Sequence, residues 1–400
     1  SIMKNIKDHF PIFKNHPSLI YLDNASTTQK PKKLMESLSH YYENYNANIG
    51  RGLYHLAYLS ETHFLHSRQK IAQFFHTDIN NLVYTSGSTE SLNLAQHIIS
   101  QISNKKKYII IPISEHHANI MTWQRLAKEQ NLSIYWISNQ EELLDPSIIS
   151  KEITNNTFLV CMSHVSNVSG EIFPIDIWGA FCKQNNIIFV VDGSQAISSL
   201  EVNLHLLDVD FYAFSTHKHY GPMGLGILYI NNKFLKYEPK NLGGGIIEDV
   251  DQDHYTLIDG IDHFQAGTPN VANIYAYSEV LTFLEKQSFF NVVEKQKELY
   301  SYLKQELENF PNIKIIEFSS KLNKTSIISF NVNNIHAHDL GTYFANKNIA
   351  IRAGKHCTHP FHDFKNVNST VRVSIGIYNS KKDITIFLKH LKEAIIFFGQ

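Results

Sequence analysis

One of the three cysteines lies among basic and imidazole side chains, in the stretch RAGKHCTHP (352–360). The thiolate is the reactive form of cysteine, and positive charge such as that of Arg352 and Lys355 near Cys357 favours it. The run HCTHPFH (356–362) also offers metal ligands, but its spacing does not suit a closed tetrahedral zinc site. The sequence therefore predicts a nucleophile at Cys357 and no metal site, with an inert cysteine or a metal ligand as the alternatives.

A second stretch could bind a phosphate group. LVYTSGSTESLNLAQHII (82–99) predicts a strand, a glycine-containing turn and a helix. A helix N-terminus offers free N–H groups and the positive end of the helix dipole, which suit an anion. Gly87 permits a close backbone approach, and Ser88 and Thr89 would add hydroxyl donors, unless they only cap the helix.

A lysine with the sequence setting of an amine nucleophile occurs in FSTHKHYGPMGLGILY (214–229). Lys218 follows an apolar segment and precedes a turn rich in glycine and proline. A lysine in such a setting can have a lowered pKa and form a Schiff base. Ser215 and His217 beside it are candidate anion ligands. A solvated lysine at the start of a loop is the alternative.

Three more polar residues accompany apolar segments. Asp192 ends the run IIFVVD, His116 follows YIIIPI within EHHAN, and Arg372 lies inside VRVSIGIYN. A buried carboxylate needs a partner such as a protonated ring nitrogen, and a buried arginine suits a substrate carboxylate. The alternatives are an Asx-turn into Gly193, a surface histidine and a structural salt bridge. Jointly, these groups nearly make up the set that pyridoxal phosphate (PLP) requires.

The elements expected to position these residues alternate between strands and helices. Five segments are continuous apolar runs, typical of strands buried on both faces: KYIIIPI (107–113), TFLVCMSHV (157–165), IIFVVDGSQ (187–195), DFYAFSTHK (210–218) and GILYI (226–230). Helical segments such as HANIMTWQRLAKEQN and DIWGAFCKQNN separate them. This pattern favours an α/β fold with a mainly parallel sheet, in which ligands bind at the carboxyl ends of the strands.

The pattern changes after about residue 280. VLTFLEKQSFFNVVEKQKELYSYLKQELENF (280–310) predicts a long helical stretch that connects two domains. Beyond it, KTSIISFNV (324–332), a helix around 338–347, VRVSIGIYN (371–379) and KKDITIFLKHLKEAIIFFG (381–399) predict a smaller α+β domain.

Composition narrows the function class. The 400 residues suffice for two domains, and a net charge of −1 favours neither nucleic acid nor an anionic membrane. No run approaches the length of a membrane span, and the first residues do not resemble a secretory signal. Three scattered cysteines, Cys161, Cys182 and Cys357, do not form a disulfide framework. We therefore expect a cytoplasmic protein.

The motifs resemble those of the cysteine desulfurases, specifically the SufS-like (group II) branch of the class V aminotransferase family, which are fold-type I PLP enzymes. The resemblance runs from YLDNASTT (21–28) to VRVSIGIYN, and its most specific motifs are the His-Lys pair before YGP and the RAG-x-HC loop. It implies a large domain (21–282) with a mainly parallel seven-stranded sheet, and an N-terminal arm (1–20). The arm would join a small C-terminal domain (283–400), which would carry the cysteine loop.

The resemblance also implies roles for single residues. Lys218 would carry the cofactor and move protons, and His116 would stack on the pyridine ring. Asp192 would hold the ring nitrogen protonated, and Gln195 would bond the phenolic oxygen. The implied phosphate ligands are Ser88, Thr89, Ser215 and His217.

Four further positions follow from the same resemblance. Thr268 would reach the phosphate of a neighbouring subunit, which implies a homodimer. Asn167 and Arg372 would hold the substrate carboxylate, and Arg352 would lie near the cysteine loop.

The implied reaction converts L-cysteine to L-alanine and leaves a persulfide on Cys357. A SufE- or SufU-like protein would accept this sulfur for iron–sulfur cluster assembly. A selenocysteine lyase acting on L-selenocysteine, or another class V lyase, is the alternative within the family. A metal-binding or interaction protein is the alternative outside it. The run Lys355-His356-Cys357 departs from the His-His-Cys that is frequent in the family, which leaves proton transfer near the thiol open.

Overall fold

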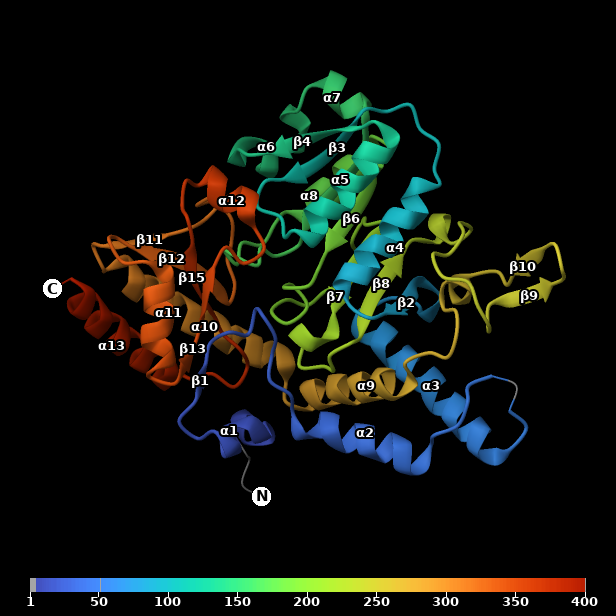
Figure 1. Cartoon of the computed structure of the whole chain (residues 1–400), viewed down its shortest axis with the longest axis horizontal. Coiled ribbons are helices and arrows are strands. Elements are labelled where there is room, and N and C mark those ends of the chain that lie inside the picture. Colours follow the sequence, from blue (N-terminus) through green and yellow to red (C-terminus); the bar gives the residue numbers. More distant parts are fainter. Residues whose placement is uncertain (1–4, 51, 400) are drawn as a thin grey trace.

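The computed structural model describes residues 5–50 and 52–399, and a seven-stranded sheet lies at its centre (Figure 1). The strand order is β2-β8-β7-β6-β5-β3-β4. Neighbours pair in parallel except β8, which runs antiparallel to both β2 and β7. The strands are β2 (Leu82–Thr85), β3 (Tyr108–Pro112), β4 (Ser133–Ile137), β5 (Thr157–Ser163), β6 (Ile188–Asp192), β7 (Phe211–Ser215) and β8 (Gly226–Ile230). The predicted mainly parallel sheet is confirmed.

Both faces of this sheet are buried, as the continuous apolar runs predict. Along β5, Val160 and Met162 pack into one core, whereas Leu159 and Cys161 pack into another on the opposite face. The alternation follows from the two-residue period of a strand. The helices that accompany the sheet are α2 (Lys32–Asn44), α3 (His55–Phe74), α4 (Ser88–Ser100), α5 (Ala118–Gln130), α6 (Gln140–Leu144), α7 (Lys151–Asn155), α8 (Ile175–Gln184) and α9 (Val271–Lys286).

The C-terminal part of the chain has its own sheet and core. Four antiparallel strands lie in the order β11-β12-β15-β14. Their bounds are β11 (Ile313–Ile315), β12 (Ile327–Val332), β14 (Arg352–Gly354) and β15 (Thr370–Ser374). The helices of this part are α10 (Phe289–Glu308), α11 (Ala337–Ala345), α12 (His359–Phe364) and α13 (Lys381–Phe398). A separate apolar cluster that includes Phe330 and Phe387 fills the space between them.

The beginning of the chain reaches this C-terminal part (Figure 1). β1 (Ile20–Tyr21) pairs in parallel with β13 (Ile349–Ala350), and Leu22 belongs to the C-terminal core. The remaining short elements are α1 (Pro11–Asn15), the hairpin β9 (Ile247–Val250) and β10 (Tyr255–Leu257), and six 3₁₀ turns: Ile6–His9, Ile79–Asn81, Pro146–Ile148, Thr216–Lys218, Asn232–Phe234 and Ile261–Phe264. No helix in the described part of the chain is long and apolar enough to cross a membrane.

The long helical stretch predicted over 280–310 is helical but interrupted. The structure has two helices, α9 and α10, which are separated at Gln287 and Ser288. Ser288 adopts a left-handed conformation with φ of 55°, which interrupts a right-handed helix. The predicted boundary between residues 282 and 283 falls within α9. The domain limits therefore stay predictions.

The two sheets are joined by a buried carboxyl group. Glu171 follows β5 and is fully buried, and it accepts the N–H groups of Phe318 at 2.6 Å and Ser319 at 2.8 Å. The backbone of Gly170 also accepts the N–H of Thr325 at 2.8 Å. These bonds fix the loop after β5, which carries Asn167, against the C-terminal part.

A buried histidine makes stability depend on pH. His219 has no exposed surface, packs among aromatic rings and lies 2.7 Å (Nδ1) from the Tyr277 hydroxyl. Burial lowers its pKa to about 3. The unfolded chain binds a proton here below about pH 6.5, which the folded chain does not, so the stabilisation present above that pH is lost as the pH falls.

We therefore expect acid to destabilise the cofactor-free native protein more than its His219→Leu variant. Between pH 7.5 and 5.5, the loss of unfolding free energy should be smaller by about 1.4 kcal/mol in the variant. Urea unfolding at both pH values measures this difference. His205→Gln, which changes an exposed histidine, should keep the native pH dependence. Equal losses in the native protein and His219→Leu would contradict a neutral, buried His219.

Candidate active site

Residues from both sheets line one cavity of about 550 Å³. From the large sheet come His116, Asn167 and Lys218, and from the C-terminal part come Cys357 and two arginines, Arg352 and Arg372. The cavity continues into a narrower recess, which the first three residues share with Ser88, Asp192, Ser194 and Gln195. The structure thus brings together nine of the thirteen residues that the sequence indicated.

Lys218 and Asp192 come from neighbouring parallel strands whose carboxyl ends meet at the recess. Asp192 is the last residue of β6, and Lys218 ends the 3₁₀ turn after β7. Burial lowers the pKa of Lys218 to about 8, although Asp192 acts in the opposite direction. Because more of the amine is then unprotonated near neutral pH, Lys218 is suited to act as a nucleophile and as a base.

The structure shows the Asx-turn that the sequence offers for Asp192. Its Oδ1 accepts the N–H of Ser194 at 3.0 Å. Its Oδ2 receives no hydrogen bond from any described residue, although Asp192 is only 7% exposed and lines the recess. A carboxylate oxygen that opens into a recess without a protein partner is suited to a donor on a bound molecule, and the contact with a ring nitrogen stays a prediction.

The ring of His116 is fixed by the start of α5. Its Nδ1 accepts the N–H of Ala118 at 3.0 Å, so the neutral ring carries its proton on Nε2. Burial, followed by the charge of Lys218, lowers the pKa of His116 to about 4. A neutral imidazole therefore lines the cavity at physiological pH.

The structure has a helix start, that of α4, where the sequence predicts an anion site. Gly87 is the N-cap, and the N–H of Ser88 donates to Ser215 Oγ at 2.7 Å. Ser215 Oγ in turn lies 3.1 Å from Ser88 Oγ. A Cβ on Gly226 would lie 2.4 Å from the Gly87 backbone, so only glycine permits this close packing. Two hydroxyls and a helix N-terminus are thereby placed together.

Four predicted residues do not line the cavity or its recess. Ser215 accepts the N–H of Ser88 and does not itself line the recess. The ring of His217 faces Thr27, with its Nδ1 3.0 Å from Thr27 Oγ1. Thr89 is exposed on the first turn of α4. Thr268 is also exposed and lines a different cavity, together with Ser86 and Glu90. Their direct roles toward a phosphate stay predictions.

The hydroxyl of one serine hydrogen-bonds both arginines of the cavity. Ser26 Oγ accepts Arg352 Nη1 at 2.7 Å and Arg372 Nη2 at 2.8 Å, and it donates to Asp23 at 2.8 Å. β14 and β15 pair the two arginines directly across from each other. Burial lowers the pKa of Arg372 to about 10, and Asp23 opposes this shift. Two positive guanidinium groups at one end of the cavity suit a carboxylate.

Cys357 lies in a tightly turned loop after β14. His356 and Cys357 both adopt left-handed conformations, with φ of 53° and 57°, and the thiol is a free, exposed one. Asn167 Nδ2 donates to the carbonyl of His356 at 2.8 Å, and Arg372 Nη1 donates to that of Asn167 at 3.1 Å. Asn167 thus links the loop after β5 to the cysteine loop.

The sequence analysis missed Ser26 and Asp23. Both lie in the YLDNASTT motif, but their link to two arginines more than 300 positions away gives no local signal. It also assigned no role to Ser194, whose buried hydroxyl faces the recess without a described partner. The same motif carries Ala25, whose carbonyl accepts Gln195 Nε2 at 2.8 Å and so orients that side chain.

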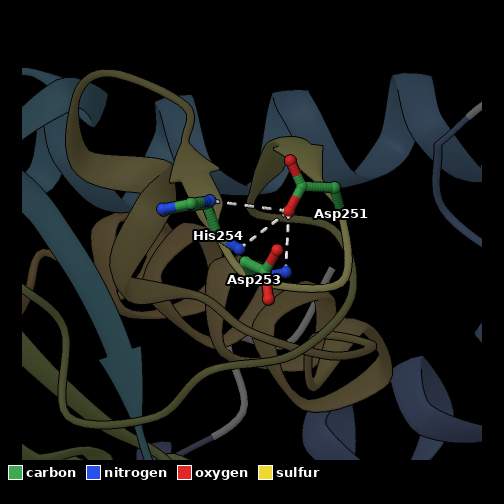
Figure 2. Close-up of side chains that lie close together, drawn as sticks. All are labelled: Asp251, Asp253 and His254. Atoms are coloured by element: carbon green, nitrogen blue, oxygen red, sulfur yellow. Dashed lines mark hydrogen bonds and ion pairs between the residues drawn. The ribbon is translucent and has the colours of Figure 1, made fainter.

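Side chains that could bind a metal ion lie close together outside this cavity. In residues 5–50 and 52–399, the one group of three close potential ligands is Asp251, Asp253 and His254, at the tip of the β9–β10 hairpin (Figure 2). Asp251 Oδ1 accepts the backbone N–H groups of Asp253 and His254, each at 2.8 Å. These bonds lower the pKa of Asp251 and account for the cluster as a turn.

The residues of the recess fit PLP. The unpartnered Asp192 Oδ2, the amine of Lys218, the neutral ring of His116 and the helix start at Ser88 match, in turn, a ring nitrogen, an aldehyde, a pyridine face and a phosphate.

Comparison with known proteins agrees with this geometry. A family model described as aminotransferase class-V matches residues 20–387. A Pyrococcus abyssi protein named "Probable cysteine desulfurase" is 33% identical over 399 residues, covering 98% of each chain. An apo cysteine desulfurase from Thermococcus onnurineus is 32% identical, with a TM-score of 0.91 over 98% of both chains.

Another solved structure extends the comparison. The cysteine desulfurase CsdA from Escherichia coli is 27% identical, with a TM-score of 0.89 over 99% of this chain and 100% of that one. The chain described here therefore belongs to the class-V aminotransferase family of PLP-dependent enzymes, among the cysteine desulfurases.

Proposed function

We propose that this protein converts L-cysteine to L-alanine and retains the sulfur as a persulfide on Cys357. The observation that carries the proposal is the single cavity lined by the amine of Lys218, the thiol of Cys357 and the paired guanidinium groups of Arg352 and Arg372. The cavity therefore holds a base, a sulfur nucleophile and a carboxylate site within reach of one small amino acid.

Lys218 would move the proton at the substrate Cα. An amine with a pKa near 8 is partly unprotonated near neutral pH, so it can accept this proton and later return it. Bound PLP would supply an electron sink for the negative charge left on Cα. Asp192 Oδ2 would hold the proton on the ring nitrogen, which strengthens that sink.

Cys357 would take the sulfur atom. Its thiolate attacks the substrate sulfur, the bond between that sulfur and carbon breaks, and the released electron pair takes up a proton on carbon. Arg372 and Arg352 would hold the substrate carboxylate by charge-assisted hydrogen bonds. In doing so they orient the substrate sulfur toward the exposed thiol.

The sulfur then leaves the protein. The exposure of Cys357 supports transfer to a second protein, and we propose a SufE- or SufU-like acceptor that feeds iron–sulfur cluster assembly. The tight loop of Cys357 supports the SufS-like branch. A cytoplasmic setting suits this chemistry, because Cys357 must remain a free thiol between turnovers.

A homodimer is the proposed assembly. Large apolar side chains are exposed along α2, α3 and the loop between them, and exposed apolar patches on soluble proteins mark interaction sites: Met35, Tyr42, Leu53, Tyr54, Leu56, Tyr58 and Leu65. Thr268 is exposed and outside the cavity of its own chain. Both facts fit a site at the subunit interface, to which Thr268 of one subunit contributes.

Replacing the proposed nucleophile should abolish sulfur transfer. In Cys357→Ser, alanine formation from L-cysteine should fall by roughly two orders of magnitude or more, because a serine hydroxyl does not accept sulfur. The assay measures alanine with a thiol reductant present. Cys182→Ala, which removes a buried thiol outside the cavity, should retain the native rate, and both variants should keep the cofactor's absorbance.

Two outcomes of this assay would reject the proposal. Equal alanine from the native protein and Cys357→Ser would show that Cys357 does not accept the sulfur. Alanine from L-selenocysteine but not from L-cysteine would assign the protein as a selenocysteine lyase.

Complementation between subunits tests the shared site. Lys218→Ala and Thr268→Val chains should each show little activity as homodimers. Mixed dimers contain one site with both native residues, so co-expression under two affinity tags should restore up to half of the native rate per dimer. A Lys218→Ala chain mixed with a Lys218→Ala,Thr268→Val chain is the control. Mixed dimers as inactive as that control would place Thr268 outside the partner's site.

A further inference from the structure

Two histidines with no assigned step lie in contact beside Cys357. His117 Nε2 is 2.9 Å from His359 Nδ1, and it accepts the backbone N–H of His359 at 3.0 Å. His117 immediately precedes α5 of the large sheet, whereas His359 is the first residue of α12 in the C-terminal part. We call this contact the His117–His359 latch.

His117 binds the cysteine loop at two points. The backbone N–H of His117 donates to the carbonyl of Cys357 at 2.8 Å, while its ring accepts from residue 359. The intervening Thr358 is fully buried, and its hydroxyl and N–H donate to Lys355 within the same turn. One residue at the start of α5 thus binds the carbonyl of Cys357 and the N–H of His359, the two backbone groups on either side of Thr358.

This support opposes a strained backbone. His356 and Cys357 are consecutive non-glycine residues with φ of 53° and 57°. A left-handed conformation is unfavourable for a non-glycine residue, so such a pair persists only where the surroundings impose it. Within the loop itself, the turn bonds of Thr358 to Lys355 engage the N–H of the Cys357–Thr358 peptide, and the carbonyl of that peptide is bonded from outside the loop by His117.

We propose that His117 is a positioning residue for Cys357 and acts through the His117–His359 latch, whose closed form requires a neutral His117. The inference rests on the proposed function only for the role of Cys357 as the sulfur acceptor. His117 does not touch the cavity, so it is not itself a catalytic residue.

The requirement for neutrality follows from the hydrogen bonds. His117 Nε2 is an acceptor, so it carries a lone pair, and the proton of the neutral ring is on Nδ1. A proton added to Nε2 would turn toward His359 Nδ1, 2.9 Å away, and would break the bond from the backbone N–H of His359 because both atoms would then be donors. Burial, followed by the charge of His359, lowers the pKa of His117. The latch is therefore closed above the ordinary histidine range and opens as the pH falls below it.

Other titratable groups face the latch from three directions. His116 lies beside His117 at the start of α5. Lys355, its ion-pair partner Asp363 and the buried His362 belong to the cysteine loop and α12. His336, His338 and Arg352 line the cavity. Of these, His116 and His362 also have a lowered pKa, chiefly through burial. A test must therefore separate the protonation of His117 from that of its neighbours.

Two substitutions at His117 make that separation. His117→Leu removes the acceptor, whereas His117→Gln can present an amide oxygen near the position of Nε2 that does not titrate. On the cofactor-loaded protein, hydrogen exchange of the peptide covering 355–361 should be about tenfold faster in His117→Leu at pH 8, which corresponds to one lost hydrogen bond. His117→Gln should recover most of the protection, and His205→Gln, an exposed histidine outside the site, should match the native protein.

The pH profile provides the readout that a purely structural role would not change. Between pH 8 and pH 5, the native protein should lose protection in residues 355–361, after correction for intrinsic exchange, whereas His117→Gln should keep it. Single-turnover persulfide formation should be slower by about tenfold in His117→Leu, with the KM for L-cysteine and the cofactor absorbance unchanged. His359→Ala combined with His117→Leu should add little further loss.

Several results would overturn the inference. They are unchanged exchange in His117→Leu, equal pH dependence in the native protein and His117→Gln, or additive losses in the double variant. Exchange is measured without turnover, so a native protein that forms no alanine would refute the proposed function and leave the test of the latch intact.

Discussion

The carbonyl oxygen of His217 is the point on which the arrangement of the site depends. It accepts the N–H of Thr28 at 3.1 Å and the Thr28 hydroxyl at 2.8 Å, and Lys30 Nζ lies 2.6 Å from it. Burial alone lowers the pKa of Lys30 to about 7. The convergence fixes the peptide that leads into Lys218 against the segment 23–30. The lysine that ends the turn after β7 is thereby held by a stretch of chain nearly 190 residues away.

The same segment carries the charge balance of the cavity. Within this segment, the carbonyl of Ala25 accepts a hydrogen bond from Gln195 and so orients it. The hydroxyl of Ser26 binds Arg352, Arg372 and the carboxylate of Asp23. Asp23 offsets only part of the positive charge, so the open end of the cavity remains cationic. This field suits an anionic group such as a carboxylate, and one short loop therefore determines both the position of the amine and the polarity of this end of the cavity.

The residues that sequence could predict are those that local pattern determines. Asp192 and Lys218 follow apolar runs that could only be buried strands, and the carboxyl ends of parallel strands meet at one edge. Ser88 lies at a helix N-terminus that the preceding glycine-containing turn predicts. In contrast, the roles of Ser26 and His359 depend on contacts across more than 200 residues, and the break at Ser288 depends on one left-handed residue within a strongly helical run. Neither kind of information is present in a local pattern.

These contacts also show how the thiol of Cys357 in the C-terminal part and the amine of Lys218 beside the large sheet are each held in place. Lys218 and Asp192 are held by β6, β7 and the segment 23–30. The left-handed Cys357 turn, however, is held from outside by His117 and Asn167, and Glu171 anchors the loop of Asn167. Segment 23–30 is itself bonded to Arg352 and Arg372, so displacement of the C-terminal part would disturb the supports of both the thiol and the amine. A reaction that uses both groups therefore requires the two parts to be docked.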